Sequence, residues 1–210
     1  ERYLAASKWH LVSSPITNAL SGIYLNIWLR AYNEATNTYG AYITPTTIPM
    51  PVCQGFSVWT NSANEVRTYT GTLNDGPIGP ISAQLTGAAS AGTGWNLVGN
   101  PYPSAIDWNA AAGWTKTGIG STIYLWNSTQ YATYNGIVGV NGGSQYIPIG
   151  QGFFVQATAP GASFSINNNA RLHNPVGFMK NEPNDVIRIK VTNAEFSDEA
   201  IVMLDADVLD

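Results

Sequence analysis

Gly94-Trp95-Asn96-Leu97-Val98-Gly99-Asn100-Pro101-Tyr102-Pro103 has an earlier counterpart in the chain, Trp9-His10-Leu11-Val12-Ser13-Ser14-Pro15, which shows the same opening pattern. Further matched blocks follow each of these stretches in the same order. They are Tyr24-Leu25-Asn26-Ile27-Trp28 with Ile123-Tyr124-Leu125-Trp126, and Pro51-Val52-Cys53-Gln54-Gly55-Phe56-Ser57-Val58 with Ile149-Gly150-Gln151-Gly152-Phe153-Phe154-Val155. Matched blocks in one shared order predict that the chain is built twice from a single pattern.

Short runs of β-branched and aromatic residues, bounded by Gly, Pro and Asn, recur along the chain, and few segments space apolar residues at helical intervals. This pattern is typical of β-strands joined by turns. The strands are predicted at 9–13, 23–28, 39–43, 55–59 and 66–72, near 81–85, and at 95–99, 123–126, 131–134, 152–156 and 162–166. The second copy is longer between Pro101 and Tyr124, where Ser104–Ala112 is predicted to form a short helix capped by Ser104.

We therefore expect an all-β fold, a β-sandwich of jelly-roll type built from two similar halves with pseudo-twofold symmetry. The sandwich would occupy residues 1–178, with the first repeat at 9–86 and the second at 94–175. Two separate small domains are the alternative, because the Gly/Ala/Ser-rich stretch 87–94 suits either a loop or a linker.

The composition changes near the C-terminus, where residues 179–210 are acidic and the preceding residues are almost neutral. Residues 179–184 are predicted to form a linker. Val186 to Val191 and Ala200 to Leu204 are predicted to form a β-hairpin, since their apolar residues alternate. This segment either closes the sandwich or begins a further domain.

Charge excludes some classes of partner. Charged residues make up only 10% of the 210 residues, and the formal net charge is −4. Nucleic acid is a poor candidate because the sequence has no basic stripe.

Two further features are excluded by the sequence. No apolar run reaches the roughly 18 residues expected of a membrane span, so we expect no membrane insertion. The single cysteine, Cys53, excludes an intramolecular disulfide.

Residues for catalysis or metal binding are sparse. The carboxylates before residue 179 lie mostly in predicted turns without a counterpart in the other repeat, although Glu34 with Asp107 keeps a glycoside hydrolase open. The two histidines, His10 and His173, do not have metal-ligand spacing, and no Gly-x-Ser-x-Gly nucleophile elbow occurs. We expect no catalytic residues, no metal site and no cofactor, with a structural calcium ion left open.

The duplication divides the aromatic residues into predicted core residues and predicted ligand-binding residues. Positions that are aromatic in both copies are best explained by shared packing, which predicts that Trp9, Trp95, Trp28, Trp126, Phe56 and Phe153 belong to the core. Aromatic residues present in one copy are candidates for ligand binding, since a sugar needs an exposed flat ring and nearby amides or carboxylates. The predicted binding residues are Trp108, Asp107, Trp114, Tyr102, Tyr131, Tyr134 and Trp59. The alternative is that Trp108 and Trp114 fill the end of the sandwich beneath the inserted loop.

Three segments carry a resemblance. They are Gly94-Trp95-Asn96-Leu97-Val98-Gly99-Asn100-Pro101-Tyr102-Pro103-Ser104, Tyr146-Ile147-Pro148-Ile149-Gly150-Gln151-Gly152-Phe153-Phe154-Val155 and Ser197-Asp198-Glu199-Ala200. Together they resemble segments of large bacterial surface proteins exported by the type IX secretion system. The resemblance implies a location outside the cell or at its surface, in proteins that handle polysaccharide or adhesion.

The predicted function is a non-catalytic, secreted carbohydrate-binding module whose partners are a polysaccharide and the other domains of a larger secreted protein. A structural spacer or adhesion domain of a cell-surface protein is the second hypothesis, and a glycoside-active enzyme is the third. Ring exposure separates the first two, because a sugar needs exposed rings whereas a spacer buries them.

Overall fold

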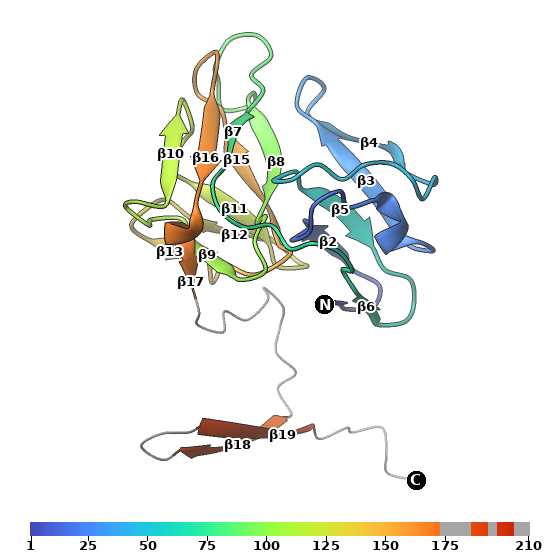
Figure 1. Ribbon diagram of the computed structural model, residues 1–210. Coiled ribbons are helices and arrows are strands. Elements are labelled where there is room, and N and C mark those ends of the chain that lie inside the picture. The colour runs from blue at the N-terminus through green and yellow to red at the C-terminus, as the bar shows by residue number, and fades with distance from the viewer. Residues whose placement is uncertain (173–185, 193–196, 204–210) are drawn as a thin grey trace. The chain divides into compact units, whose positions relative to one another are not determined.

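The computed structural model describes residues 1–172, 186–192 and 197–203, and it is all-β, as predicted (Figure 1). Two short 3-10 helices, η1 (Ser21–Tyr24) and η2 (Asn168–Ala170), are the helical elements of these described ranges. The chain divides into two compact units, Glu1–Met179 and Lys180–Asp210. In the second unit, β18 (Val186–Thr192) pairs antiparallel with β19 (Ser197–Met203). The predicted linker at 179–184 lies outside the described residues, as do His173 and the acidic C-terminal end.

Two antiparallel sheets in the first unit hold the matched sequence blocks. The first sheet has the strand order β2 (Trp9–Val12), β5 (Phe56–Trp59), β3 (Trp28–Asn33), β4 (Thr38–Tyr42). The second has the order β8 (Trp95–Gly99), β15 (Gly152–Gln156), β11 (Ile123–Trp126), β12 (Tyr131–Tyr134), β13 (Gly139–Val140). The strands that contain or directly follow the matched blocks thus have the same order in both sheets. The strand predicted at 23–28 is wrong, because η1 and a turn occupy this stretch up to residue 27 and β3 begins at Trp28.

Smaller sheets complete this unit. They are β1 (Arg2–Leu4) with β6 (Glu65–Arg67), β16 (Ser163–Ile166) between β10 (Trp114–Thr117) and β7 (Ile78–Ser82), and β9 (Ala105–Asp107) between β14 (Tyr146–Ile147) and β17 (Arg171–Leu172). The helix predicted over Ser104–Ala112 is wrong, because β9 occupies the start of this stretch and pairs with a neighbour on each side. Long-range strand pairing thus replaces the local helical preference.

Reciprocal backbone contacts join the two sheets. An isolated bridge links Val12 with Gln151, and another links Gln54 with Val98. The two valines hold matched positions in the repeat, and so do the two glutamines. Each copy therefore uses the same element to contact the other.

The hydrogen bonds beside these bridges are reciprocal too. The N–H of Ser13 donates to the carbonyl of Gly150 at 3.0 Å, and the N–H of the matched Gly99 donates to the carbonyl of Cys53 at 2.8 Å. Both acceptor residues have left-handed backbone, with φ of 63° at Gly150 and 64° at Cys53. The same tight turn therefore presents a carbonyl group to the other sheet in both copies, although only one of the two turns contains glycine.

Each sheet covers its own hydrophobic cluster. Phe56 lies in the cluster of the first sheet and Phe153 in that of the second, both buried, as predicted. The prediction that the matched tryptophans are core is wrong for Trp28, which is 47% exposed, and for Trp9, which is half-buried outside these clusters. Trp95 and Trp126 are half-buried and pack against a third, small cluster, which consists of Leu11, Leu97 and Phe154. Side chains alternate between the two faces of a strand, and the tryptophans point to the face opposite the phenylalanine clusters.

Among the described residues, no helix reaches the length and apolarity needed to cross a lipid bilayer.

Candidate functional site

The aromatic residues of the inserted segment lie in the core. Trp108 is 2% exposed and Tyr102 is fully buried, and both belong to the hydrophobic cluster that contains Phe153. The Nε1 of Trp108 donates to the carbonyl of Ser121 at 2.8 Å, and its ring meets that of Trp114 at a centroid separation of 4.9 Å. The prediction that Trp108 and Tyr102 present rings to a sugar is therefore wrong, and the alternative that the loop aromatics fill the interior describes the structure.

The polar groups around the inserted segment bond to one another. The Nε1 of Trp114 donates to the carbonyl of Asp107 at 2.7 Å, and the Asp107 carboxylate accepts from Gln145 at 3.1 Å. Tyr134 is buried, and its hydroxyl accepts from the Asn109 amide at 2.6 Å. Of the residues predicted to bind ligand, Asp107, Trp114 and Tyr134 thus support the inserted segment and do not line an open aromatic pocket.

Two predicted residues remain accessible. Tyr131 is 38% exposed. Trp59 is half-buried, and its ring packs against that of Trp9 with a centroid separation of 5.3 Å. The two do not line the same pocket, since Tyr131 lies among aromatic residues at the junction of the sheets whereas Trp59 is part of the first sheet alone.

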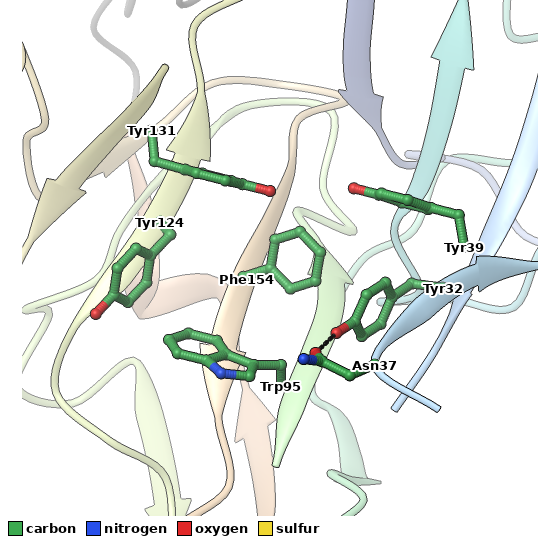
Figure 2. A pocket seen from close by; sticks show the side chains of 7 residues that line it. All are labelled: Tyr32, Asn37, Tyr39, Trp95, Tyr124, Tyr131 and Phe154. Atoms are coloured by element: carbon green, nitrogen blue, oxygen red, sulfur yellow. Dashed lines mark hydrogen bonds between the residues drawn. The ribbon is translucent and has the colours of Figure 1, made fainter. Parts of the chain in front are cut away.

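Six aromatic rings line a pocket of about 400 Å³ where the two sheets meet (Figure 2). Its volume lies in the range usual for small-molecule sites, roughly 300 to 1,000 Å³. The first sheet contributes residues from β3, β4 and the turn that joins them, and the second sheet contributes residues from β8, β11, β12 and β15. The lining residues are Tyr32, Asn37, Tyr39, Trp95, Tyr124, Tyr131 and Phe154.

Edge-to-face contacts hold the rings of this pocket in place. Phe154 is 5% exposed, and Tyr32 from the other sheet meets it at a centroid separation of 4.8 Å and an angle of 83°. Trp95 and Tyr124 meet at 4.9 Å and 88°. Such pairs are favourable beyond the area that they bury, by about 0.5 to 1.5 kcal/mol. The pocket is therefore preorganised by contacts between its own rings.

Neutral polar groups stand among the rings. The hydroxyl of Tyr32 donates to Oδ1 of Asn37, which leaves the Asn37 amide nitrogen without a hydrogen bond to any described residue. The hydroxyls of Tyr39 and Tyr131 point toward each other (Figure 2). Both phenols are protonated at neutral pH and able to donate a hydrogen bond, and burial raises the pKa of each still further above that range.

A smaller pocket of about 160 Å³ adjoins the first, because Tyr39 and Tyr131 line both. Its other lining residues are Trp9, Leu11, Arg30, Ser57 and Trp126. We call the two together the aromatic groove. Polar and charged groups are few in it, and Arg30 is its cation.

Of the residues that line the groove, Tyr131 is among the predicted binding residues, and Phe154 is an aromatic residue that the sequence places in one copy only, on the outward side of its strand. The remaining residues of the groove were not predicted. The rule that duplicated aromatics are core removed Trp9, Trp95 and Trp126 from the candidates. A usable signal was present in β3, where Trp28, Arg30 and Tyr32 alternate with smaller residues and so share one face of the strand.

The carboxylates kept open for catalysis both serve internal hydrogen bonds. One oxygen of Glu34 accepts from Gly94 N–H at 2.9 Å, and the other accepts from the Thr86 hydroxyl at 2.6 Å. Desolvation, the largest single influence, acts to raise the pKa of Glu34, but the hydrogen bonds from Thr86 and Gly94 together outweigh it and hold the pKa below its usual value. Among the residues described, no group of three or more His, Cys, Asp or Glu gathers as metal ligands would.

A protein-family profile described as "Domain of unknown function (DUF8693)" matches residues 4–193. No curated protein and no solved structure shows significant similarity to the chain. The profile spans both copies of the repeated pattern and brings no activity with it, so a function has to be inferred from the geometry of the aromatic groove.

Proposed function

The chain belongs to the family described as a domain of unknown function (DUF8693), and we propose that it is a non-catalytic carbohydrate-binding module that binds polysaccharide by aromatic stacking and neutral hydrogen bonds. The observation that carries the proposal is the pocket at the junction of the sheets, where six of the seven lining residues are aromatic and the seventh is the amide Asn37. Binding would occur there, and not at the inserted segment around Trp108.

The chemistry of sugars suits this lining. A pyranose ring has apolar C–H faces that stack on flat aromatic rings and equatorial hydroxyls that need hydrogen-bond partners at the edge. Trp95 and Tyr124 supply large rings, and the Asn37 amide and the Tyr39 and Tyr131 hydroxyls supply neutral donors and acceptors. Because the pocket is lined without a charged residue, its affinity for a neutral polysaccharide should change little with salt.

The test is affinity electrophoresis of the protein in gels that contain soluble plant, algal and microbial polysaccharides. We expect retardation by one or a few of them. Tyr124→Ala should weaken the interaction by about 5-fold or more, since a lost stacking contact costs about 1 kcal/mol. Tyr146→Ala is the matched control, because Tyr146 is 41% exposed but does not line the pocket.

A structural spacer or adhesion domain is the second candidate, and one observation favours it: the pocket rings also pack on one another across the two sheets, as Tyr32 does on Phe154. A spacer would use these contacts only to fix the angle between the sheets. No retardation by any soluble polymer, with no binding to insoluble cellulose or chitin, would overturn the binding proposal and support the spacer. A glycoside-active enzyme ranks third, because the Glu34 carboxylate already accepts hydrogen bonds from Thr86 and Gly94.

We also propose that the two sheets are copies of one β-unit related by a pseudo-twofold axis, as in the predicted jelly-roll type of sandwich. The pair of bridges, Val12 with Gln151 and Gln54 with Val98, supports this relation. In a twofold arrangement, a contact from residue i to residue j is accompanied by one from the equivalent of i to the equivalent of j. The resemblance to proteins exported by the type IX system supports a location outside the cell.

A further inference from the structure

Arg30 is a cation held among aromatic rings without an anion. Its guanidinium carbon lies 4.3 Å from the ring centroid of Trp9, 5.0 Å from that of Tyr39 and 5.2 Å from that of Tyr42. The side chain makes no ion pair and no hydrogen bond with any described residue, and its Nε is buried. In contrast to Arg30, Arg67 forms an ion pair with Glu65, and Arg171 forms one with Asp75.

Arg30 lies within the aromatic groove, beside the proposed sugar site. It lines the smaller pocket with Trp126 and Ser57, and that pocket shares Tyr39 and Tyr131 with the larger one. A sugar chain stacked in the larger pocket would therefore continue past the two tyrosines onto the guanidinium group.

The guanidinium group of Arg30 favours a ligand that has a carboxylate. Its planar fork of N–H donors matches the two oxygens of a carboxylate, and such charge-assisted bonds are about twice as strong as neutral ones. Aromatic rings on its flanks shield the half-buried guanidinium group in part from water, and partial shielding strengthens the attraction for an anion. No described acidic side chain forms an ion pair with Arg30, so a ligand would supply the anion that pairs with it.

We propose that Arg30 binds the carboxylate of a uronic acid unit, so that the aromatic groove recognises an acidic polysaccharide. The inference rests on the proposed carbohydrate-binding function and narrows its ligand class. Stacking in the larger pocket would supply affinity for the sugar chain, and Arg30 would supply the preference for a charged unit over a neutral one.

The experiment compares matched polymers. Polygalacturonate, alginate and hyaluronan are each cast in gels as they are and after chemical reduction of their carboxyl groups to alcohols, beside a panel of neutral polysaccharides. The wild-type protein should bind at least one acidic polymer about 10-fold more tightly than its reduced form, given the strength of a hydrogen-bonded charge pair. Raising the salt concentration should remove part of this difference, because the pair is accessible to solvent ions.

Variants of Arg30 test the residue itself. Arg30→Gln should lose the preference for the acidic form while it keeps binding to the reduced form, and Arg30→Lys should keep only part of the preference, because an ammonium group lacks the planar fork. Lys8→Gln is the matched control: it removes the same charge, and Lys8 lines neither pocket of the groove. Mobility in gels without polymer corrects for the altered charge, and retained binding to the reduced polymer shows that each variant is folded.

The outcomes separate the two proposals. If the wild-type protein binds neutral or reduced polymers as well as acidic ones, or if Arg30→Gln keeps the preference, the assignment of Arg30 is overturned while the carbohydrate-binding function stands. If no polymer of either kind binds, both proposals fail.

Discussion

The backbone N–H of Gly55 donates to the carbonyl oxygen of Leu97 at 3.1 Å, which joins the start of β5 in the first sheet to β8 in the second. The approach is so close that a Cβ on Gly55 would lie 2.5 Å from the carbonyl oxygen of Val98 and 2.8 Å from Cγ of Leu97. Gly152, which matches Gly55 in the repeat, has the same relation to the other copy: its Cβ would lie 2.9 Å from the carbonyl oxygen of Val12. Glycine is required here for contact between the sheets.

Gly55→Ala should therefore destabilise the protein by about 1 to 3 kcal/mol, the usual cost of forcing an extra methyl group into a packed interior. Gly40→Ala in β4 is the matched control, because its Cβ would meet only the carbonyl oxygen of Ala31 at 3.6 Å, an ordinary contact. Urea unfolding of both variants measures the two changes. Equal stability of the two variants would contradict the close approach of the sheets.

Trp108→Ala should lower the free energy of unfolding by about 3 to 5 kcal/mol, as is usual when a buried Trp is truncated. Its ring is buried against Phe153, and its indole N–H is satisfied by Ser121. Trp28→Ala, which removes a ring that is 47% exposed, should cost about 1 kcal/mol. Chemical denaturation with fluorescence detection compares the two, and a loss for Trp108→Ala no larger than that for Trp28→Ala would show that Trp108 is not in the core.

Stability should fall in mild acid because of His10. Burial, the largest influence, lowers the pKa of His10 from its usual 6.5; its hydrogen bond with the carbonyl of Ala5 acts the other way, and the charges of Arg2 and Lys8 lower it further. Since the unfolded chain binds the proton more readily, stability is complete above about pH 6.5 and decreases as the pH falls toward the depressed value. Melting temperatures of the wild type and His10→Gln between pH 8 and pH 5 test this expectation. The variant should show a flatter profile, and parallel profiles would contradict the assignment to His10.

Glu34 should anchor the loop that connects the two copies. Its carboxylate accepts from the backbone N–H of Thr86 at 3.0 Å and of Gly94 at 2.9 Å. Glu34→Ala should therefore accelerate hydrogen exchange of these two amides, as measured by NMR. Glu65→Ala, which deletes a carboxylate paired with Arg67 at 2.9 Å, should leave their exchange unchanged.

The same anchor should weaken in acid. Because the folded-state pKa of Glu34 is lowered, the contribution of its carboxylate is present above the usual value of 4.5 and is lost as the pH falls through the lowered value. Protection of the Thr86 and Gly94 amides in the wild type should fall over that range relative to amides within β2. Protection that does not change with pH would mean that other contacts hold the loop.

Much of the fold could be predicted from local sequence patterns. Alternation and turn residues identified the all-β class and most strands of the two large sheets, since both features act over a few residues. The Ser104–Ala112 segment was misassigned because its strand, Ala105–Asp107, is stabilised by partners distant in sequence. The candidate site was harder to predict, and Tyr131 is the one predicted binding residue that lines the groove.

The candidate site was harder to predict than the fold because each strand has two faces. The repeated sequence blocks predict two β-units of one pattern, and alternation places Phe56 and Trp59 on opposite sides of their strand, because side-chain direction has a local period of two residues. No local rule states which side becomes core. Contact between the copies at Gly55 and Gly152 brings the two tryptophan-bearing faces together, and the pocket between Tyr32, Trp95 and Phe154 exists only because side chains far apart in sequence meet there.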